Sequence, residues 1–168
     1  MVSIKYLKDN SMSFTGHRDI READYESLRY KIRLVIKTLY KKGICTYYCG
    51  MARGFDMLAA EEVIKLKGTY KCLNLVAVVP FRGQCGQWNE TDKKRYWNIL
   101  ANVDKSIILS ETYYKGCLLR RNDFMLAQSC GIIAYFDGNP KGGTFYTCRR
   151  AKKMGMDIIN VYANCTRN

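Results

Sequence analysis

The chain has 168 residues, 48% of them hydrophobic and 26% charged, which is typical of an ordinary soluble globular protein with a single domain over residues 1–168. Its formal net charge of +13 favours anionic partners, either nucleic acid or phosphorylated small molecules. The longest apolar run, LVAVVPF, is far shorter than the roughly 20 residues that cross a bilayer, and no secretory leader is visible. We therefore expect a cytoplasmic protein without a membrane partner.

Eight cysteines and one histidine bear on metal and redox chemistry. No Cys-x-x-Cys pair occurs, and Cys45 and Cys49 would lie about 13 Å apart on one strand at roughly 3.3 Å per residue, too far to share an ion. The chain length also disfavours a secreted disulfide scaffold. We expect reduced thiols and no metal site.

Short apolar runs alternate with amphipathic stretches along the whole chain. Leu28, Ile32, Ile36 and Leu39 recur at helical spacing, for example, whereas the run after Cys72 is apolar throughout its middle, as in a strand covered on both faces. The patterns predict strands at 11–15, 44–49, 73–81, 105–109, 131–136 and 157–162, with helices at 24–42, 55–67, 91–101, 118–129 and 144–154. This alternation indicates an α/β fold, a doubly wound, mostly parallel sheet with helices on both faces, as in Rossmann-like three-layer domains.

Glycine follows each of the first five predicted strands, and arginine follows the first three. The loops read GHR (16–18), GMARGFD (50–56), PFRGQ (80–84), SETYYKG (110–116) and DGNPKGGT (137–144). Because the carboxyl ends of parallel strands meet at one edge of a sheet, these loops predict a shared site there. Taken singly, Asp56 and Thr144 are equally well explained as helix N-caps, and His17 as a surface turn residue.

Several of these groups are suited to phosphate. Gly142 and Gly143 precede a helix whose first amides lack partners, and Arg18, Arg53 and Arg82 could hold an anion through paired hydrogen bonds. Trp88, Tyr113 and Tyr114 are candidates to stack on a base, although such aromatics more often pack. Gly-x-Gly-x-x-Gly and Gly-Lys-Ser/Thr are both absent, so neither a dinucleotide cofactor nor an ATPase is indicated, and no cofactor is predicted.

The segments SFTGHR, GMARGFDMLAAE, VVPFRGQ, RRNDFM and DGNPKGGT occur in the order and approximate spacing found in YpsA-like proteins. The chain resembles this family of the SLOG superfamily from residue 13 to about 161; DprA-type and cytokinin-activating LOG-type proteins belong to the same superfamily. The resemblance implies a Rossmann-like fold, homo-oligomers and a pocket for a nucleotide-derived ligand. On matched positions, that pocket is lined by Thr15, Gly16, Arg18, Gly50, Ala52, Arg53, Gly54, Asp56, Arg121, Asn122, Met125, Gly142, Gly143 and Thr144. His17 and Arg82, from the loops themselves, complete the candidate ligand-binding set.

One departure from the LOG-type pattern concerns mechanism. LOG-type hydrolases carry Pro-Gly-Gly-x-Gly-Thr-x-x-Glu, whose Glu serves in cleaving the N-glycosidic bond, and Thr147 stands at that position here. A hydroxyl cannot replace a carboxylate that stabilises developing positive charge. The sequence therefore favours a binding protein over an enzyme.

Three functions follow, in order of preference. The first is a sensor or sequestering module for a nucleotide or ADP-ribose-like ligand; relatives in bacterial defence sense cyclic ADP-ribose-like signals, which suggests a role in defence or in phage counter-defence. The second is a nucleotide N-glycosidase that uses Asp56 or Asp137 in place of the lost Glu. The third is single-stranded nucleic-acid binding, motivated by the net charge and by the DprA-type proteins.

Overall fold

The computed structural model describes residues 7–162. These form a six-stranded sheet and five α-helices, together with 3-10 turns at Lys8–Asn10 and Glu22–Asp24. In chain order the elements are β1 Ser11–Gly16, α1 Tyr25–Lys41, β2 Thr46–Cys49, α2 Phe55–Lys67, β3 Asn74–Val79, α3 Glu90–Asn102, β4 Lys105–Ile108, α4 Cys117–Ala127, β5 Gly131–Tyr135, α5 Gly142–Lys153 and β6 Asp157–Asn160. Every strand and helix that the sequence predicts is present.

The strands lie in the order β4-β3-β2-β1-β5-β6, and every neighbouring pair is parallel. From β1 the chain moves outward to β4, then returns to β5 on the other side of β1 and ends at β6. The direction of winding therefore reverses between β1 and β5. In open α/β sheets the crevice at such a switch point is where ligands bind.

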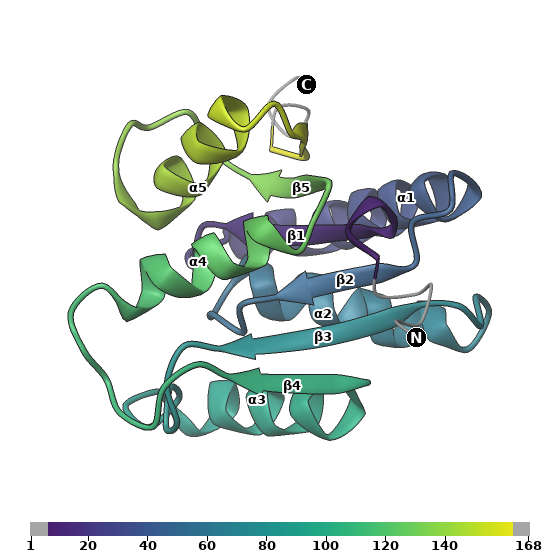
Figure 1. Ribbon diagram of the computed structural model, residues 1–168. Coiled ribbons are helices and arrows are strands. Elements are labelled where there is room, and N and C mark those ends of the chain that lie inside the picture. The colour runs from purple at the N-terminus through teal and green to yellow at the C-terminus, as the bar shows by residue number, and fades with distance from the viewer. Residues whose placement is uncertain (1–6, 163–168) are drawn as a thin grey trace.

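Helices cover both faces of the sheet, which confirms the predicted three-layer α/β fold. Figure 1 shows α1, α2 and α3 behind the sheet and α4 and α5 in front of it. Contacts of α1 with α2 and of α2 with α3 form one layer, and contacts of α4 with α5 form the other. Right-handed crossovers require this arrangement, because the chain reverses its course along the sheet after β4.

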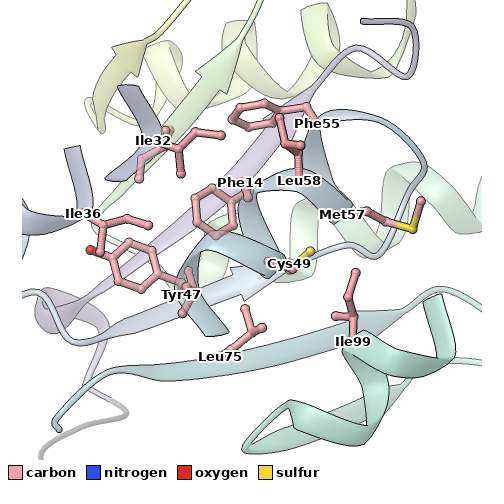
Figure 2. Packing of buried hydrophobic residues seen from close by; sticks show 14 of the residues in the cluster. Phe14, Ile32, Ile36, Tyr47, Cys49, Phe55, Met57, Leu58, Leu75 and Ile99 are labelled. Carbon is pink, nitrogen blue, oxygen red and sulfur yellow. The ribbon is translucent and has the colours of Figure 1, made fainter. Parts of the chain in front are cut away.

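The main core lies between the sheet and the α1–α3 layer. Met12 and Phe14 of β1 point into it, alternating with Ser13 and Thr15, which belong to the opposite face. Figure 2 shows Phe14 among its neighbours: its ring stacks on Tyr47 at 5.5 Å between centroids, and the ring of Phe55 meets it edge-on at 6.2 Å. This packing fixes the start of α2 against β1.

The face under α4 and α5 is smaller and partly polar. Its buried apolar residues fall into two separate clusters, one around Leu126 and Ile132 and one around Val76 and Met125. Between them the hydroxyl of Ser13 donates to the backbone carbonyl of Met125 at 3.1 Å. This bond joins α4 to the middle of β1 and sets the position of the α4 side chains that face the carboxyl edge of the sheet.

Two element boundaries differ from the prediction for identifiable reasons. The second strand begins at Thr46 rather than Ile44, because the Ile44 amide donates to the Leu39 carbonyl and closes the turn after α1. The third strand ends at Val79, because Pro80 has no amide hydrogen to continue the ladder.

Residues 7–162 contain no membrane-spanning helix, no cluster of metal ligands and no disulfide bond. None of their helices combines the length and apolarity of a bilayer-spanning segment, and none of their His, Cys, Asp and Glu side chains gather in threes about a point where a metal ion would fit. Their seven cysteines are all free thiols.

Candidate functional site

A cleft of about 720 Å³ opens at the carboxyl edge of the sheet, where β1 and β5 end. Its volume is that of a site for a small organic ligand. The segments that line it are the ends of β1 and β5, the loops after β1, β2, β4, β5 and β6, and the N-terminal turns of α2, α4 and α5. Its lining residues are Phe14, Thr15, Gly16, His17, Arg18, Asp19, Arg21, Ala52, Asp56, Tyr113, Gly116, Leu118, Leu119, Arg121, Asn122, Tyr135, Asp137, Lys141, Gly142, Gly143, Thr144 and Tyr162.

Most of the predicted site residues meet in this cleft, although they lie up to about 130 positions apart in the sequence. They are Thr15, Gly16, His17, Arg18, Ala52, Asp56, Arg121, Asn122, Gly142, Gly143 and Thr144. Exposed Arg18 and the start of α5 therefore border one hollow.

Three predicted residues lie elsewhere. The Arg53 guanidinium lies 5.9 Å from the centre of the Trp88 ring and 4.0 Å from Asp92, on the loop side of α3. Arg82 donates to Glu111 at 2.7 Å on the surface, so its charge is already paired. Met125 is buried beneath α4 and is part of the apolar packing there.

Gly50 and Gly54 do not line the cleft but support its walls. Gly54 has φ of 78°, and a Cβ atom there would collide with the backbone carbonyl of Arg18. The next amide, that of Phe55, donates to the His17 carbonyl at 3.1 Å, so the loop after β1 rests directly on the start of α2. At Gly50 a Cβ would come within 2.7 Å of the Arg121 guanidinium, whose Nη1 donates to the Gly50 carbonyl.

The floor of the cleft holds two buried charged groups, Asp56 from α2 and Arg121 from α4, each only 5% exposed. Burial raises the pKa of Asp56 to about 6, although Arg121, the Ala52 amide and Arg18 act in the opposite direction. Burial also lowers the pKa of Arg121 below its usual value. Arg121 Nε donates to the Asn122 amide oxygen at 2.7 Å, which orients the guanidinium along the floor.

The start of α5 forms one side of the cleft. Lys141 is its N-cap residue, no side chain caps the helix, and no acidic residue lies in its first turn. Gly142 has φ of 82° with open space around it, and Gly143 and Thr144 follow along the cleft. The free amides and the positive end of the helix dipole make this a favourable place for an anion.

His17 ties two of the lining loops together. Its amide donates to the Tyr135 carbonyl at 3.2 Å, and its Nε2 accepts from the Asp137 amide at 3.0 Å and lies 2.9 Å from Asp137 Oδ1. The imidazole packs against the rings of Tyr135, Phe136 and Tyr162. Hydrogen bonding from the Asn139 amide, with His17 nearby, lowers the pKa of Asp137. His17 thus holds the loop after β1 against the loop that leads to α5.

The side of the cleft formed by the loop after β4 and the start of α4 is apolar. Tyr113, 64% exposed, packs edge-on against Phe81 at 5.4 Å, and Leu118 and Leu119 continue the surface. Gly116, in the left-handed region at φ of 93°, makes the turn that starts α4. The cleft therefore has a polar, cationic side at α5 and an apolar side at α4.

Comparison with known families agrees with this architecture. The model of the YpsA family, described as the YspA SLOG family, matches residues 14–162, which is nearly the whole described chain. The chain belongs to the YpsA family. The matched range begins in β1 and ends after β6, so it includes every segment that lines the cleft.

Among curated proteins, the YpsA-family chain is similar to UPF0398 proteins. One from Halalkalibacterium halodurans is 31% identical over 120 residues, which cover 70% of this chain and 64% of that protein. One from Brevibacillus brevis is 32% identical over 102 residues, covering 60% of this chain and 54% of that protein. The chain thus spans less than two thirds of the length of these relatives.

A solved structure of DNA processing protein A from Helicobacter pylori has a similar fold. The two superpose with a TM-score of 0.64, covering 93% of this chain and 67% of that one, at 19% sequence identity. At this identity the likeness concerns the fold of the YpsA-family chain.

Some lining residues were not in the predicted set. Lys141 stands directly before the glycine pair, and a cation next to an uncapped helix start was a usable signal. Arg21 lies three residues after Arg18 and pairs with Asp24 at 2.7 Å. Leu118 and Leu119 belonged to a correctly predicted helix, but the direction in which they point depends on how α4 lies across the sheet.

Proposed function

We propose that this YpsA-family protein binds a phosphorylated, nucleotide-like small molecule in the cleft, as a sensor or sequestering module. The observation that carries the proposal is the uncapped start of α5, with Lys141 at its N-cap and no acidic residue in its first turn, opening into a cleft of about 720 Å³. An anion there would accept hydrogen bonds from the amides of Gly143 and Thr144. A phosphate group carries negative charge and several acceptor oxygens, which suits two backbone amides beside a cation.

The two sides of the cleft suit the two ends of such a ligand. The phosphate would lie at α5, within reach of Lys141 and Arg18, while the base would pack on the apolar side formed by Tyr113, Leu118 and Leu119. Tyr113 has an exposed ring that can stack on a base. A ligand with only one of these parts would leave half of the cleft without complementary contacts.

Binding without cleavage is the better supported activity, because of Thr147. This residue stands where LOG-type hydrolases have a Glu, and it is only 2% exposed. Its hydroxyl donates to the Gly143 carbonyl at 2.9 Å, within the helix rather than toward the cleft. The α5 helix therefore presents backbone amides and no carboxylate to a bound ligand.

Calorimetric titration with nucleoside monophosphates and ADP-ribose, beside the matching nucleosides, tests the proposal. We expect the phosphorylated compounds to bind and the nucleosides to bind far more weakly. Gly143→Asp places a negative charge at the proposed phosphate position and should weaken binding by about 10- to 100-fold. Gly143→Asn has nearly the same size without the charge, and a Cβ at this position meets only Asn122 Nδ2 at 3.7 Å, so it controls for bulk.

Equal weakening by Gly143→Asp and Gly143→Asn would place the anion elsewhere. If none of the phosphorylated compounds binds to the wild-type protein, the proposal is wrong.

A second candidate, single-stranded DNA binding, rests on two other observations. The net charge is +13, and the similar Helicobacter pylori structure is of a protein described by its single-stranded DNA binding mode. Binding of this kind should weaken steeply as salt is raised, because phosphate contacts release counterions. A fluorescently labelled oligonucleotide titrated at several salt concentrations measures that slope, and Gly143→Asp separates the two candidates, since an extended basic surface would hardly sense one charge in the cleft.

A further inference from the structure

Asp56 is a buried carboxylate that opens on the cleft with an incomplete set of partners. Its side chain is 5% exposed, and its Oδ2 accepts a single hydrogen bond, from the Ala52 amide at 3.3 Å. No donor within residues 7–162 contacts its Oδ1, and no basic side chain in that range lies within 4.0 Å. The two buried side-chain polar atoms without a partner in the described residues belong to Tyr47 and Arg95, so Asp56 Oδ1 is an oxygen reachable from the cleft and can accept hydrogen bonds from a ligand.

Helix capping does not account for this carboxylate. Asp56 is the second residue of α2, but the N-cap position is Gly54 and no side chain there makes a cap hydrogen bond. The one bond that the Asp56 carboxylate accepts comes from Ala52, which precedes the helix. The carboxylate therefore accepts no hydrogen bond from the α2 amides and faces the cleft.

The surroundings of Asp56 limit what the missing donor can be. Arg121 lies on the same floor, and Arg18 and Lys141 border the cleft, so a cationic ligand group would meet repulsion. A phosphate oxygen would be repelled by the carboxylate itself. The donor is thus neutral, and two neighbouring hydroxyls that both donate to one carboxylate would satisfy it.

The place of Asp56 in the fold agrees with such a donor. It follows β2, the neighbour of β1 in the sheet, and Arg121 on the same floor donates to Asn122. Asn122 Nδ2 lies beside Gly143, where the phosphate is proposed to bind. In dinucleotide-binding doubly wound folds a carboxylate about 20 residues beyond the phosphate-binding turn bonds a ribose hydroxyl, so a carboxylate at this edge of a parallel sheet is chemically suited to ribose.

We infer that the Asp56 carboxylate accepts hydrogen bonds from the ribose of the ligand, and that the ligand class is a ribonucleotide with free 2′- and 3′-hydroxyls. The inference rests on the proposed function, since it assigns a second part of the same ligand. It adds a prediction that phosphate binding alone does not make: the cleft rejects 2′-deoxyribonucleotides.

The experiment titrates the guanine and adenine ribonucleoside monophosphates and their 2′-deoxy forms against wild-type protein, Asp56→Asn and Asp9→Asn. Asp9→Asn makes the same chemical change on an exposed residue at the opposite edge of the sheet. We expect wild type and Asp9→Asn to favour the ribonucleotide by about 10- to 100-fold, the effect of losing a hydrogen bond to a charged group. In Asp56→Asn the preference should fall to within about threefold, chiefly through weaker ribonucleotide binding.

The wild-type protein supplies a second measurement in case Asp56→Asn folds poorly. The charged or titratable groups that face Asp56 are Arg121 on α4, Arg18 after β1 and Cys49 at the end of β2. The pKa of Asp56 is about 6, so the ribose preference should diminish as the pH is lowered through that value. The affinity for the 2′-deoxy compound should change less over the same range.

The outcomes separate this inference from the proposed function. If neither nucleotide binds wild type, both fail. If both bind wild type equally well, or if Asp56→Asn keeps the ribose preference, Asp56 does not bind the sugar, while the proposed nucleotide binding is not overturned. A loss in Asp56→Asn of discrimination between guanine and adenine, with the ribose preference intact, would assign the carboxylate to the base and overturn the inference.

Discussion

The starts of α2 and α5 have a similar backbone geometry but differ in how the rest of the protein packs around them. Both α2 and α5 follow a strand of the central sheet, both start beside a glycine with positive φ (78° at Gly54 and 82° at Gly142), and neither has a side-chain cap. At α2 the protein fills the space: Gly54 packs on the Arg18 backbone and the Phe55 amide is bonded to His17. At α5 nothing lies within 4 Å of a Cβ placed on Gly142.

The two helix starts also differ in charge. The first turn of α2 carries Asp56, whereas the first turn of α5 has no acid and its N-cap is Lys141. The α2 start is packed against the loop after β1 and carries a carboxylate, whereas the α5 start is open, as the proposed anion site requires. A glycine-rich turn before a helix therefore does not define an anion site, because the site exists only where tertiary packing leaves the amides free.

Replacing Gly54 and Gly142 by alanine should give the largest difference between the two helix starts. Gly54→Ala combines an unfavourable positive φ with a clash against backbone, and we expect it to lower the free energy of unfolding by more than about 3 kcal/mol. Gly142→Ala meets only the φ penalty and should cost about 1–2 kcal/mol. Urea denaturation of both variants measures the difference. Equal costs would show that the α2 start is no more tightly packed than the α5 start.

Asp56→Asn tests the charge of the closed helix start. Burial raises the Asp56 pKa from 3.8 to about 6, so the folded protein binds this proton more tightly than the unfolded chain does. The stabilisation from the protonated form is complete below pH 3.8 and is lost as the pH rises through 6, a loss of about 2–3 kcal/mol. Asp56→Asn has no such titration, so its stability relative to wild type should increase by that amount between pH 4 and pH 7. A constant difference across this range would contradict the raised pKa.

The elements of the fold could be predicted from the sequence, whereas the membership of the site could be predicted only in part. Residues such as Leu28 and Ile32 recur at helical spacing because one side of their helix is buried, and this periodicity is local information. The β1 and α5 loops were correctly brought together because parallel strands must place their carboxyl ends at one edge. The start of β2 moved because the Ile44 amide bonds the Leu39 carbonyl in the turn after α1, and apolar patterning does not report such a bond.

The direction of a loop side chain is not local information. Arg53 and Arg82 follow strands just as Arg18 does, but Arg53 lies over Trp88 and Arg82 pairs with Glu111, residues from other loops. Of these three loop arginines, only Arg18 lines the cleft. Arg121 and Asn122 entered the prediction through the family resemblance, since nothing in a helical repeat indicates which of its residues meets a cleft.

Removing the cation at the open helix start sharpens the comparison further. Lys141→Gln keeps the length of the side chain and takes away its charge, and we expect it to weaken nucleotide binding by about 3- to 10-fold, because an exposed cation near a phosphate acts through solvent. The same calorimetric titration as for Gly143→Asp measures this, and raising the salt concentration should reduce the difference. An unchanged affinity would leave the amides of α5 as the whole anion site.

Arg82→Gln should have the smallest effect on nucleotide affinity, and it tests whether Arg82 lies outside the binding cleft. Arg82 was predicted to clamp phosphate, but its guanidinium is held by Glu111 at 2.7 and 3.1 Å on the surface, outside the cleft lining. Since the pair is exposed, breaking it should alter nucleotide affinity by less than about twofold, against the larger change from Lys141→Gln. A loss comparable to that of Lys141→Gln would mean that the loop after β3 moves toward a bound ligand. The open start of α5 would then need a second cationic loop to complete the anion site.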